Sequence, residues 1–441
     1  MLLRATFGLL VSRDAGATFR WICEEALLYT GAWDPPIALS ADGAIHAGLA
    51  DGLAQTPDGC TSTRNASIGN LLVADLANSA SGETVLAIPS VAGVVNRLYV
   101  SHDRGMTYLA GGPGLAGILP TSVEAAASLA TRVYVAGIEE ATRRPLVLRS
   151  DDEGATWIRG GNAFAMQADA YIAGVDATRP DRVWVRADEA LSGTSLFRSD
   201  DGAATATRVA MTAGPMLGFA ASDDGVHVWY GGPDDGLFRS DDGGATFARV
   251  SPLRVTCLRH HAGVLYLCLD WLREAGALAR WVDGAASHEI VLRFADVAGS
   301  VSCPAGTTGR DVCEARWPTV LATLRTRGDA GGDASLPADA ADTSDVGGAS
   351  DTGRAPGCRC SAPGRRPNVR VSLAAAVLLA LGSLVRGRAT RTARRWPRER
   401  PGPRRSPEYC RRCRRSPPRG LWHLRLAGCA AEPVRSGNHT R

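Results

Sequence analysis

One short string of residues recurs along the first two thirds of the chain and constrains the fold more than any other feature. Its full form reads SRDAGATF, SHDRGMTY, SDDEGATW and SDDGGATF, and three weaker forms read TPDGCTS, SDDGAATA and WVDGAASH. The seven copies begin at Ser12, Thr56, Ser101, Ser150, Ser199, Ser240 and Trp281. Their starts are 44, 45, 49, 49, 41 and 41 residues apart. A period of about 40–50 residues is the length of one four-stranded propeller blade.

The flanking residues predict that each string is the turn of a β-hairpin. Apolar runs such as NRLYV, RPLVLR, TSLFR and DGLFR precede the string, and strand-like runs such as WIRG and FARV follow it. The serine hydroxyl and the aspartate carboxylate can accept hydrogen bonds from turn amides, and glycine tolerates a positive φ. Threonine favours the return to extended structure, and the closing aromatic can pack between sheets.

The pattern S-x-D-x-G-x-T-[W/F] resembles the Asp-box, or BNR, repeat. That family includes sialidases, sortilin-type receptor domains, some xyloglucan hydrolases and the photosystem II assembly propeller. The matching residues are Ser12, Asp14, Gly16, Thr18, Phe19, Ser101, Asp103, Gly105, Thr107, Tyr108, Ser150, Asp152, Gly154, Thr156, Trp157, Ser199, Asp201, Ser240, Asp242, Gly244, Thr246 and Phe247.

The resemblance covers about residues 1–300 and implies an all-β propeller of seven blades, with eight or six as alternatives. In the family the box lies on the outer turns, away from the central channel where ligands bind, so it indicates fold and not function. The copies at Ser199 and Trp281 lack the glycine, and Cys60 replaces it in the copy at Thr56. We expect those turns to be looser, or to be held in another way.

The first copy starts so early that a single strand precedes it, whereas a blade needs two or three. Either residues 289–303 close the ring or the chain has lost residues before Met1. We favour the loss, because Met1 enters in mid-strand and no signal peptide precedes it.

The cysteines indicate an oxidising compartment. The globular part holds six of them, and Cys257 and Cys268 are close enough to clip a hairpin, while Cys303 and Cys313 flank the loop CPAGTTGRDVC. The set of candidate disulfide cysteines is Cys23, Cys60, Cys257, Cys268, Cys303 and Cys313. Buried free thiols are the alternative.

Charge divides the chain into two unlike parts. Residues 386–441 carry 17 Arg against three acids, whereas residues 1–385 carry 32 Arg against 42 acids. All 49 basic residues are arginine, which excludes a P-loop lysine and a Schiff-base lysine. The folded part is therefore acidic and the tail strongly basic.

The last third of the chain predicts four segments in order. The propeller is expected to span residues 1–317, and a disordered spacer rich in Asp, Ala and Gly to span 318–357. Residues 358–388 hold the two cysteines of a GCRC motif (residues 357–360), the apolar run VSLAAAVLLALGSLV and an arginine cluster. This order resembles the myxobacterial C-terminal sorting signal, which implies processing at Cys358 or Cys360. A short membrane anchor is the alternative, although a 15-residue apolar run is short for a span of about 20 residues.

Residues 389–441 are expected to form a disordered Arg-rich tail, for which nucleic-acid or anionic-lipid binding is the weaker reading. Its CRRC motif, Cys410 to Cys413, lacks a second pair of zinc ligands at a suitable spacing.

Neither the acid doublets nor the histidine pair of the sequence predicts a catalytic or metal site. Three acid doublets, Asp151–Asp152, Asp200–Asp201 and Asp241–Asp242, fall inside the strings, and two more, Asp223–Asp224 and Asp234–Asp235, lie outside them. His260 and His261 are neighbours on a predicted hairpin and face opposite sides of it, which makes them poor metal ligands together.

Two further patterns also fail to predict a catalytic site. Gly112, Gly114 and Gly117 match a dinucleotide-binding spacing, but Pro120 follows without a helical pattern, so we expect a loop between blades. Sialidase chemistry needs a nucleophilic tyrosine, and Tyr99, Tyr134 and Tyr266 lie in apolar strand runs.

The sequence therefore predicts an exported, monomeric, non-catalytic propeller at the bacterial cell surface or outer membrane, or released from it. Its partner would be a surface glycan, a peptide or a protein, and nucleic acid is not expected. No catalytic residue, cofactor or metal ligand is predicted. The alternative is a sialidase-like glycoside hydrolase whose active site the sequence does not reveal.

Overall fold

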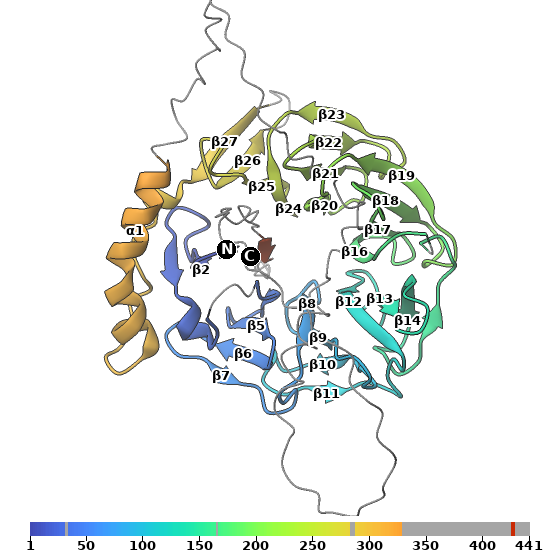
Figure 1. The fold of residues 1–441 in the computed structure, drawn as a ribbon, viewed down its shortest axis with the longest axis horizontal. Coiled ribbons are helices and arrows are strands. Elements are labelled where there is room, and N and C mark those ends of the chain that lie inside the picture. Colours follow the sequence, from blue (N-terminus) through green and yellow to red (C-terminus); the bar gives the residue numbers. More distant parts are fainter. Residues whose placement is uncertain (31–33, 165, 283–286, 329–424, 428–441) are drawn as a thin grey trace, which may run out of the picture. The chain divides into compact units, whose positions relative to one another are not determined.

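The computed structural model describes residues 1–30, 34–164, 166–282, 287–328 and 425–427. Within them the strands form seven four-stranded antiparallel sheets arranged as a ring (Figure 1), which we call blades I to VII. The seven-bladed form of the predicted propeller is confirmed.

The first four blades have these strands. Blade I contains β28 (Arg425–Ala427), β1 (Leu2–Ala5), β2 (Gly8–Val11) and β3 (Arg20–Ile22), and blade II contains β4 (Ile37–Leu39), β5 (Ile45–Leu49), β6 (Gly52–Thr56) and β7 (Thr63–Arg64). Blade III contains β8 (Val73–Asn78), β9 (Val85–Pro89), β10 (Tyr99–Ser101) and β11 (Leu109–Ala110), and blade IV contains β12 (Ile118–Ala125), β13 (Val133–Glu139), β14 (Pro145–Ser150) and β15 (Ile158–Arg159).

The other three blades follow the same order. Blade V contains β16 (Tyr171–Val175), β17 (Val183–Asp188), β18 (Thr194–Ser199) and β19 (Thr207–Thr212), and blade VI contains β20 (Gly218–Ala221), β21 (Val228–Gly232), β22 (Gly236–Ser240) and β23 (Ala248–Ser251). Blade VII contains β24 (Val255–His261), β25 (Val264–Leu269), β26 (Leu278–Val282) and β27 (Ser287–Leu292). The helices are two 3₁₀ turns, η1 (Glu24–Leu27) and η2 (Phe294–Asp296), the π-helical turn η3 (Gly309–Cys313) and α1 (Glu314–Gly328).

The core lies between neighbouring blades. The second strand β9 is apolar on both faces because its sheet is covered on both sides, and all five of its residues are buried. One buried cluster joins Leu86 and Ile88 of blade III to Val133 and Val135 of blade IV. Trp184 of blade V likewise contacts Phe219 of blade VI, with ring centroids 5.4 Å apart. Apolar side chains are therefore buried between one blade and the next.

The recurring strings occupy equivalent places. The first six copies each begin at the end of a third strand or directly after it and lead into the fourth strand of the same blade, from Ser12 after β2 to Ser240 at the end of β22. The copy at Trp281 begins within β26, and its turn residues 283–286 lie outside the described residues.

Blade I is completed from distant parts of the sequence. Its innermost strand is β28, a part of the segment expected to be a disordered tail, and Leu3 of β1 pairs with Leu426. Residues 289–303, one expected source of the closing strand, instead end blade VII and then pass the outer edge of blade I. There Ser300 forms a parallel bridge with Trp21 of β3.

All six candidate cysteines form disulfides, which supports an oxidising environment. The pairs are Cys23–Cys313, Cys60–Cys303 and Cys257–Cys268. The last is the predicted hairpin clip. Cys303 and Cys313 flank one loop but do not pair with each other. Cys303 pairs with Cys60 of blade II, and Cys313 pairs with Cys23, which follows the last strand of blade I. The loop crosses the edges of these blades, and the Gly309 amide donates to the Cys60 carbonyl at 2.8 Å.

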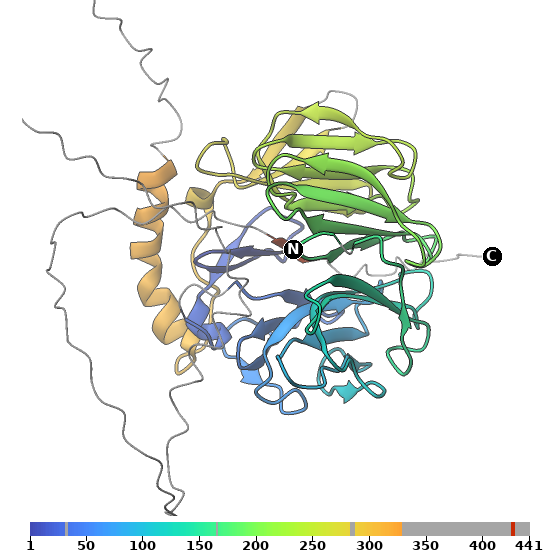
Figure 2. The ribbon, with the colours of Figure 1, turned by 45° about the vertical axis from the view of Figure 1, so that its right-hand side comes forward.

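Helix α1 follows this doubly anchored loop and packs against blade I (Figure 2). The Trp317 and Trp21 rings lie 5.4 Å apart, and Arg316 forms an ion pair with Glu25. The helix continues past residue 318, where the spacer was expected to begin, because buried Leu324 joins the same apolar cluster. Cys358, Cys360 and the apolar run lie outside the described residues, as does the tail apart from Arg425–Ala427. Among the described helices, none is long and apolar enough to cross a membrane.

The long-range disulfides should contribute more stability than the hairpin disulfide. Cys60–Cys303 closes a loop with a sequence separation of 243 residues, and Cys257–Cys268 one of 11. In the loop-entropy model the longer loop restricts the unfolded chain more strongly. We expect replacement of both Cys60 and Cys303 by alanine to lower the free energy of unfolding by about 2–5 kcal/mol, measured by urea denaturation. The corresponding double variant at Cys257 and Cys268 should lose less, and an equal or larger loss there would contradict this ranking.

Candidate functional site

The turns formed by the recurring string share one hydrogen-bond network, seen clearly in blade VI. The Ser240 hydroxyl donates to Asp242 Oδ1 at 2.7 Å and accepts from the Gly244 amide at 2.8 Å. The Asp242 carboxylate also accepts from the amide of Thr246 at 2.9 Å and from its hydroxyl at 2.6 Å. The aspartate therefore satisfies turn donors that would otherwise depend on water.

The same bonds recur in the turns at Ser12, Ser101, Ser150 and Ser199. The Ser199 turn keeps its network although it lacks the glycine, because Ala203 adopts the left-handed conformation, with φ +69°. The Thr56 turn is held differently: Asp58 accepts from the Cys60 amide at 2.8 Å, and Cys60 is disulfide-bonded.

These carboxylates are held in the ionised form. Hydrogen bonds from Thr18 and Ser12 lower the pKa of Asp14 to about 2, and those from Ser101 and Thr107 outweigh desolvation to bring the pKa of Asp103 to about 2. The pKa of Asp242 is also lowered, first by Ser240 and then by Thr246. A carboxylate of this kind is unsuited to act as a general acid near neutral pH.

In blades III, IV and VI the glycine of the turn lies against the preceding blade. A Cβ added to Gly244 would come within 2.5 Å of Trp184 Nε1 in blade V, and one added to Gly105 within 2.2 Å of the His46 ring in blade II. Burial lowers the pKa of His46 to about 4, which keeps its ring neutral in this contact. The closing aromatics pack in the same layer, as in Phe247, whose ring lies 4.8 Å from that of Tyr230.

A second network, which the sequence analysis did not predict, repeats in blades IV, V and VI. The first aspartate of each doublet forms ion pairs with two basic residues. One is an arginine two residues before it in the chain, and the other lies directly before the second strand of the same blade. In blade V, Asp200 accepts from Arg182 Nε at 2.6 Å and from Arg198 Nη2 at 2.9 Å. The counterparts are Arg132, Asp151 and Arg149 in blade IV, and His227, Asp241 and Arg239 in blade VI.

This network continues from blade IV to blade V. Arg132 Nη1 lies 2.6 Å from Asp181 Oδ1, and the Tyr134 hydroxyl donates to the Pro180 carbonyl at 2.6 Å. Both partners belong to the loop that joins β16 to β17. Tyr134, one of the three tyrosines in apolar strand runs, is buried and therefore has a structural role in this contact.

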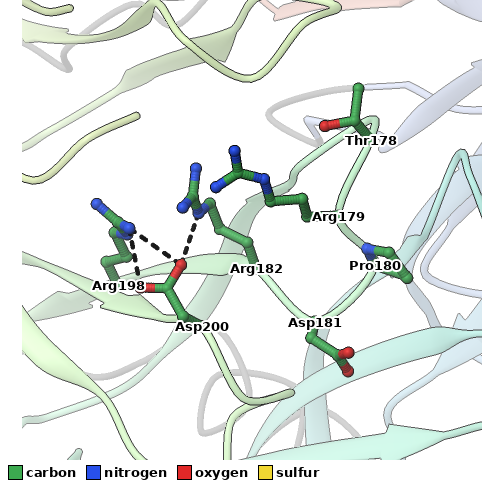
Figure 3. Close-up of a pocket in the computed structure, with 7 residues that line it drawn as sticks. All are labelled: Thr178, Arg179, Pro180, Asp181, Arg182, Arg198 and Asp200. Carbon is green, nitrogen blue, oxygen red and sulfur yellow. Dashed lines mark hydrogen bonds and ion pairs between the residues drawn. The ribbon is translucent and has the colours of Figure 1, made fainter. Parts of the chain in front are cut away.

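The loop and the network line an open surface pocket of about 530 Å³ on blade V, shown in Figure 3. Its lining residues are Thr178, Arg179, Pro180, Asp181, Arg182, Arg198 and Asp200. Desolvation opposes the ionisation of Asp200, but the bonds from Arg182 and Arg198 lower its pKa. The pocket therefore presents fixed guanidinium groups around an ionised carboxylate.

A different cluster lies at the opposite end of the same β16–β17 hairpin. Tyr171 pairs with Arg186, whose guanidinium carbon lies 4.9 Å from the tyrosine ring centroid. The Asp188 amide donates to Asp169 Oδ1 at 3.1 Å. Burial, followed by the charge of Asp188, raises the pKa of Asp169, and burial followed by Asp169 raises that of Tyr171 to about 12. This is a protonatable carboxyl group beside a tyrosine, an arginine and a second carboxylate.

The doublets outside the strings have structural partners. Asp224 accepts from the Val226 amide at 3.0 Å, and Asp235 accepts from the Ala213 and Gly214 amides at 3.0 and 2.9 Å. These contacts hold the chain in turns of blade VI.

The remaining sequence candidates are separated. His260 lies against Trp229, with ring centroids 5.7 Å apart, and His261 ends β24 beside it. Gly112, Gly114 and Gly117 lie between β11 and β12. Tyr99 and Tyr266 lie on β10 and β25 in different blades. Within the described residues no group of three or more His, Cys, Asp or Glu side chains is arranged to hold a metal ion.

Comparison with known proteins identifies no family, since no family model and no curated protein matches the chain. Solved structures of low identity do match. YCF48 from Cyanidioschyzon merolae is 13% identical over 58% of this chain and 83% of its own, with a TM-score of 0.41. "YCF48 bound to D1 peptide" is 12% identical over 49% of this chain and 65% of its own, with a TM-score of 0.34. The GH74 xyloglucanase from Xanthomonas campestris is 14% identical over 65% of this chain and 61% of its own, with a TM-score of 0.32.

The chain thus spans less than two thirds of the last two structures. At such identities and TM-scores no activity or ligand is carried over from them. The propeller assignment rests on the strand order of the chain itself.

Acid should weaken the turn networks. The pKa of Asp103 is lower in the folded protein than its ordinary value of 3.8, so its stabilising effect is complete above that value and is lost as the pH falls toward 2. We expect the melting temperature to fall between pH 5 and pH 2, and Asp103→Asn to be less stable at pH 5 but to lose less on acidification. Asp234→Asn, an exposed aspartate outside the strings, controls for the loss of one charge. An unchanged acid profile in Asp103→Asn would contradict this role.

Proposed function

We propose that this chain is an exported, non-catalytic β-propeller that binds a peptide or protein partner at the bacterial surface. The observation that carries the proposal is the blade V pocket, a preformed recess in which arginines are fixed by carboxylates on a rigid blade. Binding sites are commonly concave and largely preformed, and about 300–1,000 Å³ is the usual size for small ligands. The pocket falls within that range.

The Asp-box resemblance is part of this proposal. It is supported by the repeated Ser–Asp–Gly–Thr network and its place after every third strand in the described blades I and III to VI. We propose the same place for the copy at Trp281, because it too leads from a third to a fourth strand.

Export is supported by the three disulfides, since such bonds persist in oxidising compartments and are rare in the reducing cytosol. Surface display would follow from processing at Cys358 or Cys360, which lie outside the described residues. The intact mass of the native product tests this: a chain that ends near Cys358 supports display, and one that retains Arg441 in the cytoplasm contradicts it.

A binding role is favoured over catalysis by the state of the pocket carboxylates. Asp200 is engaged by two arginines and Asp181 by Arg132 of blade IV. Asp200 is unsuited to transfer a proton, because desolvation is outweighed by the hydrogen bonds from both arginines, which lower its pKa. The pocket can therefore orient and hold a ligand without reacting with it.

One observation favours a glycoside hydrolase as the second candidate. Such enzymes commonly use one carboxyl group that stays protonated and one that is ionised. Asp169, with its raised pKa, and Asp188 lie together beside Tyr171 and Arg186. This cluster would be the catalytic centre if the chain were an enzyme.

The two candidates are separated by assaying the full-length oxidised protein in two ways. We expect saturable binding to members of a peptide array and no turnover of fluorogenic glycosides between pH 4 and 8. Asp169→Asn should then leave peptide binding unchanged. Glycoside turnover that Asp169→Asn abolishes and Asp234→Asn retains, without peptide binding, would overturn the proposal in favour of the hydrolase.

A further inference from the structure

We propose that the blade V pocket is a carboxylate-binding site that recognises acidic side chains of a peptide, with Arg179 as the residue that selects them. This inference rests on the proposed function and names the chemistry of the ligand. It concerns the surface at the β16–β17 loop.

The first argument is the charge of the pocket. Three arginines line it, Arg179, Arg182 and Arg198, against two aspartates. Asp181 points away from the three guanidinium groups in Figure 3 and is engaged by Arg132, with 2.6 Å between the charged atoms. Asp200 is shared by Arg182 and Arg198. The charged partners of these residues, Arg132 on Asp181 and buried Asp176 at 3.4 Å from Arg182, cancel each other, so the pocket carries an excess of one positive charge.

The second argument is the supply of unused donors. A guanidinium group carries five N–H donors and no acceptor. The Arg179 side chain is exposed and makes no hydrogen bond or ion pair with the described residues. An anion in the pocket would supply the missing acceptors and reduce the repulsion among the three arginines.

The third argument is that the loop holding Arg179 is already ordered by its own contacts. Buried Asp176 accepts from the amide and hydroxyl of Thr178, both at 2.8 Å, and from the Arg179 amide at 3.1 Å. Arg182 donates its amide to the Arg179 carbonyl at 2.9 Å. Because the loop is fixed before a ligand arrives, little ordering entropy is lost on binding.

Blade IV provides an internal comparison. Its corresponding loop has the same closing bonds, from Ala126 N to Arg132 O and from Arg132 N to Leu129 O, and it carries the same Arg–Asp–Arg network. The position of Arg179 is occupied there by Leu129. The network is thus a repeated structural feature, whereas the third arginine distinguishes blade V from blade IV.

The size of the charge favours a carboxylate over a phosphate. A carboxylate carries one negative charge and matches the excess, whereas a phosphate monoester carries about −1.5 to −2 at neutral pH and would exceed it. A planar carboxylate also fits the donor fork of an arginine with two parallel hydrogen bonds. Acidic peptide side chains present such groups at an exposed surface.

The test measures binding of labelled peptides to the full-length oxidised protein by fluorescence anisotropy. The probes are a glutamate-rich peptide, the same peptide with glutamine at each glutamate, and the same peptide with phosphoserine. The variants are Arg179→Leu, which installs the blade IV residue, and Arg13→Leu, an exposed arginine in the first turn, as the control. Melting temperatures of both variants check that they are folded.

We expect Arg179→Leu to weaken binding of the glutamate peptide by about 10- to 100-fold and Arg13→Leu to leave it unchanged. The glutamine peptide should bind as weakly to the native protein as the glutamate peptide does to Arg179→Leu.

Equal binding of the glutamate and glutamine peptides, or no effect of Arg179→Leu, overturns the inference but leaves peptide binding intact. Tighter, Arg179-dependent binding of the phosphoserine peptide overturns the choice of carboxylate. If no peptide binds at all, both the inference and the proposed function fail.

Discussion

The aspartate of the recurring turn fixes the geometry on which the blades depend. Its two oxygens satisfy the amide and hydroxyl of the threonine that follows, and the serine hydroxyl binds the glycine amide. This network holds the glycine in the left-handed conformation and places it directly against the blade before it. The relation is the same in blades III, IV and VI: Gly105 faces His46, Gly154 faces Leu98, and Gly244 faces Trp184. A local turn therefore sets the spacing between blades and, through it, the apolar layers that form the core.

The Arg–Asp networks and the disulfides add further contacts to those of the turn glycines, each in a different part of the ring. In blades IV to VI the charged groups lie on the same turns, and blade IV also contacts blade V through Arg132 and Tyr134. At blades I and II the disulfides fasten the loop before α1 to the outer edges. The pocket on blade V arises where an ordered loop meets one of these networks, so a feature that supports the fold also presents its arginines to a ligand.

The sequence predicts the features whose residues are close together in the chain. The turn network lies within eight residues, and its period predicts the number of blades without knowledge of distant contacts. The Cys257–Cys268 hairpin is local in the same sense. The partners of Cys60 and Cys23 could not be derived, because 243 and 290 residues separate them from Cys303 and Cys313.

The candidate sites were missed because each combines several strands. Asp169 and Asp188 meet only when β16 pairs with β17, and the pocket needs the loop before Arg182 as well as β18. A signal for the Arg–Asp network was present, however. The string RSDD appears three times, in blades IV, V and VI, each preceded by Arg or His before a valine and an aromatic residue. Arg179 does not belong to such a repeat, so the sequence did not predict its role in the pocket.

The contact between the turn glycine and the preceding blade is tested most directly by two alanine substitutions that carry the same backbone strain. Gly244 has φ +80° and lies against Trp184, whereas Gly263 has φ +78° and no heavy atom within 4 Å of an added Cβ. Free energies of unfolding from urea denaturation should show Gly244→Ala to be more destabilising than Gly263→Ala by about 1–3 kcal/mol, because it alone adds overpacking between blades. Equal losses in the two variants would mean that the turn glycine serves its own backbone conformation only, and that the spacing of the blades is set elsewhere.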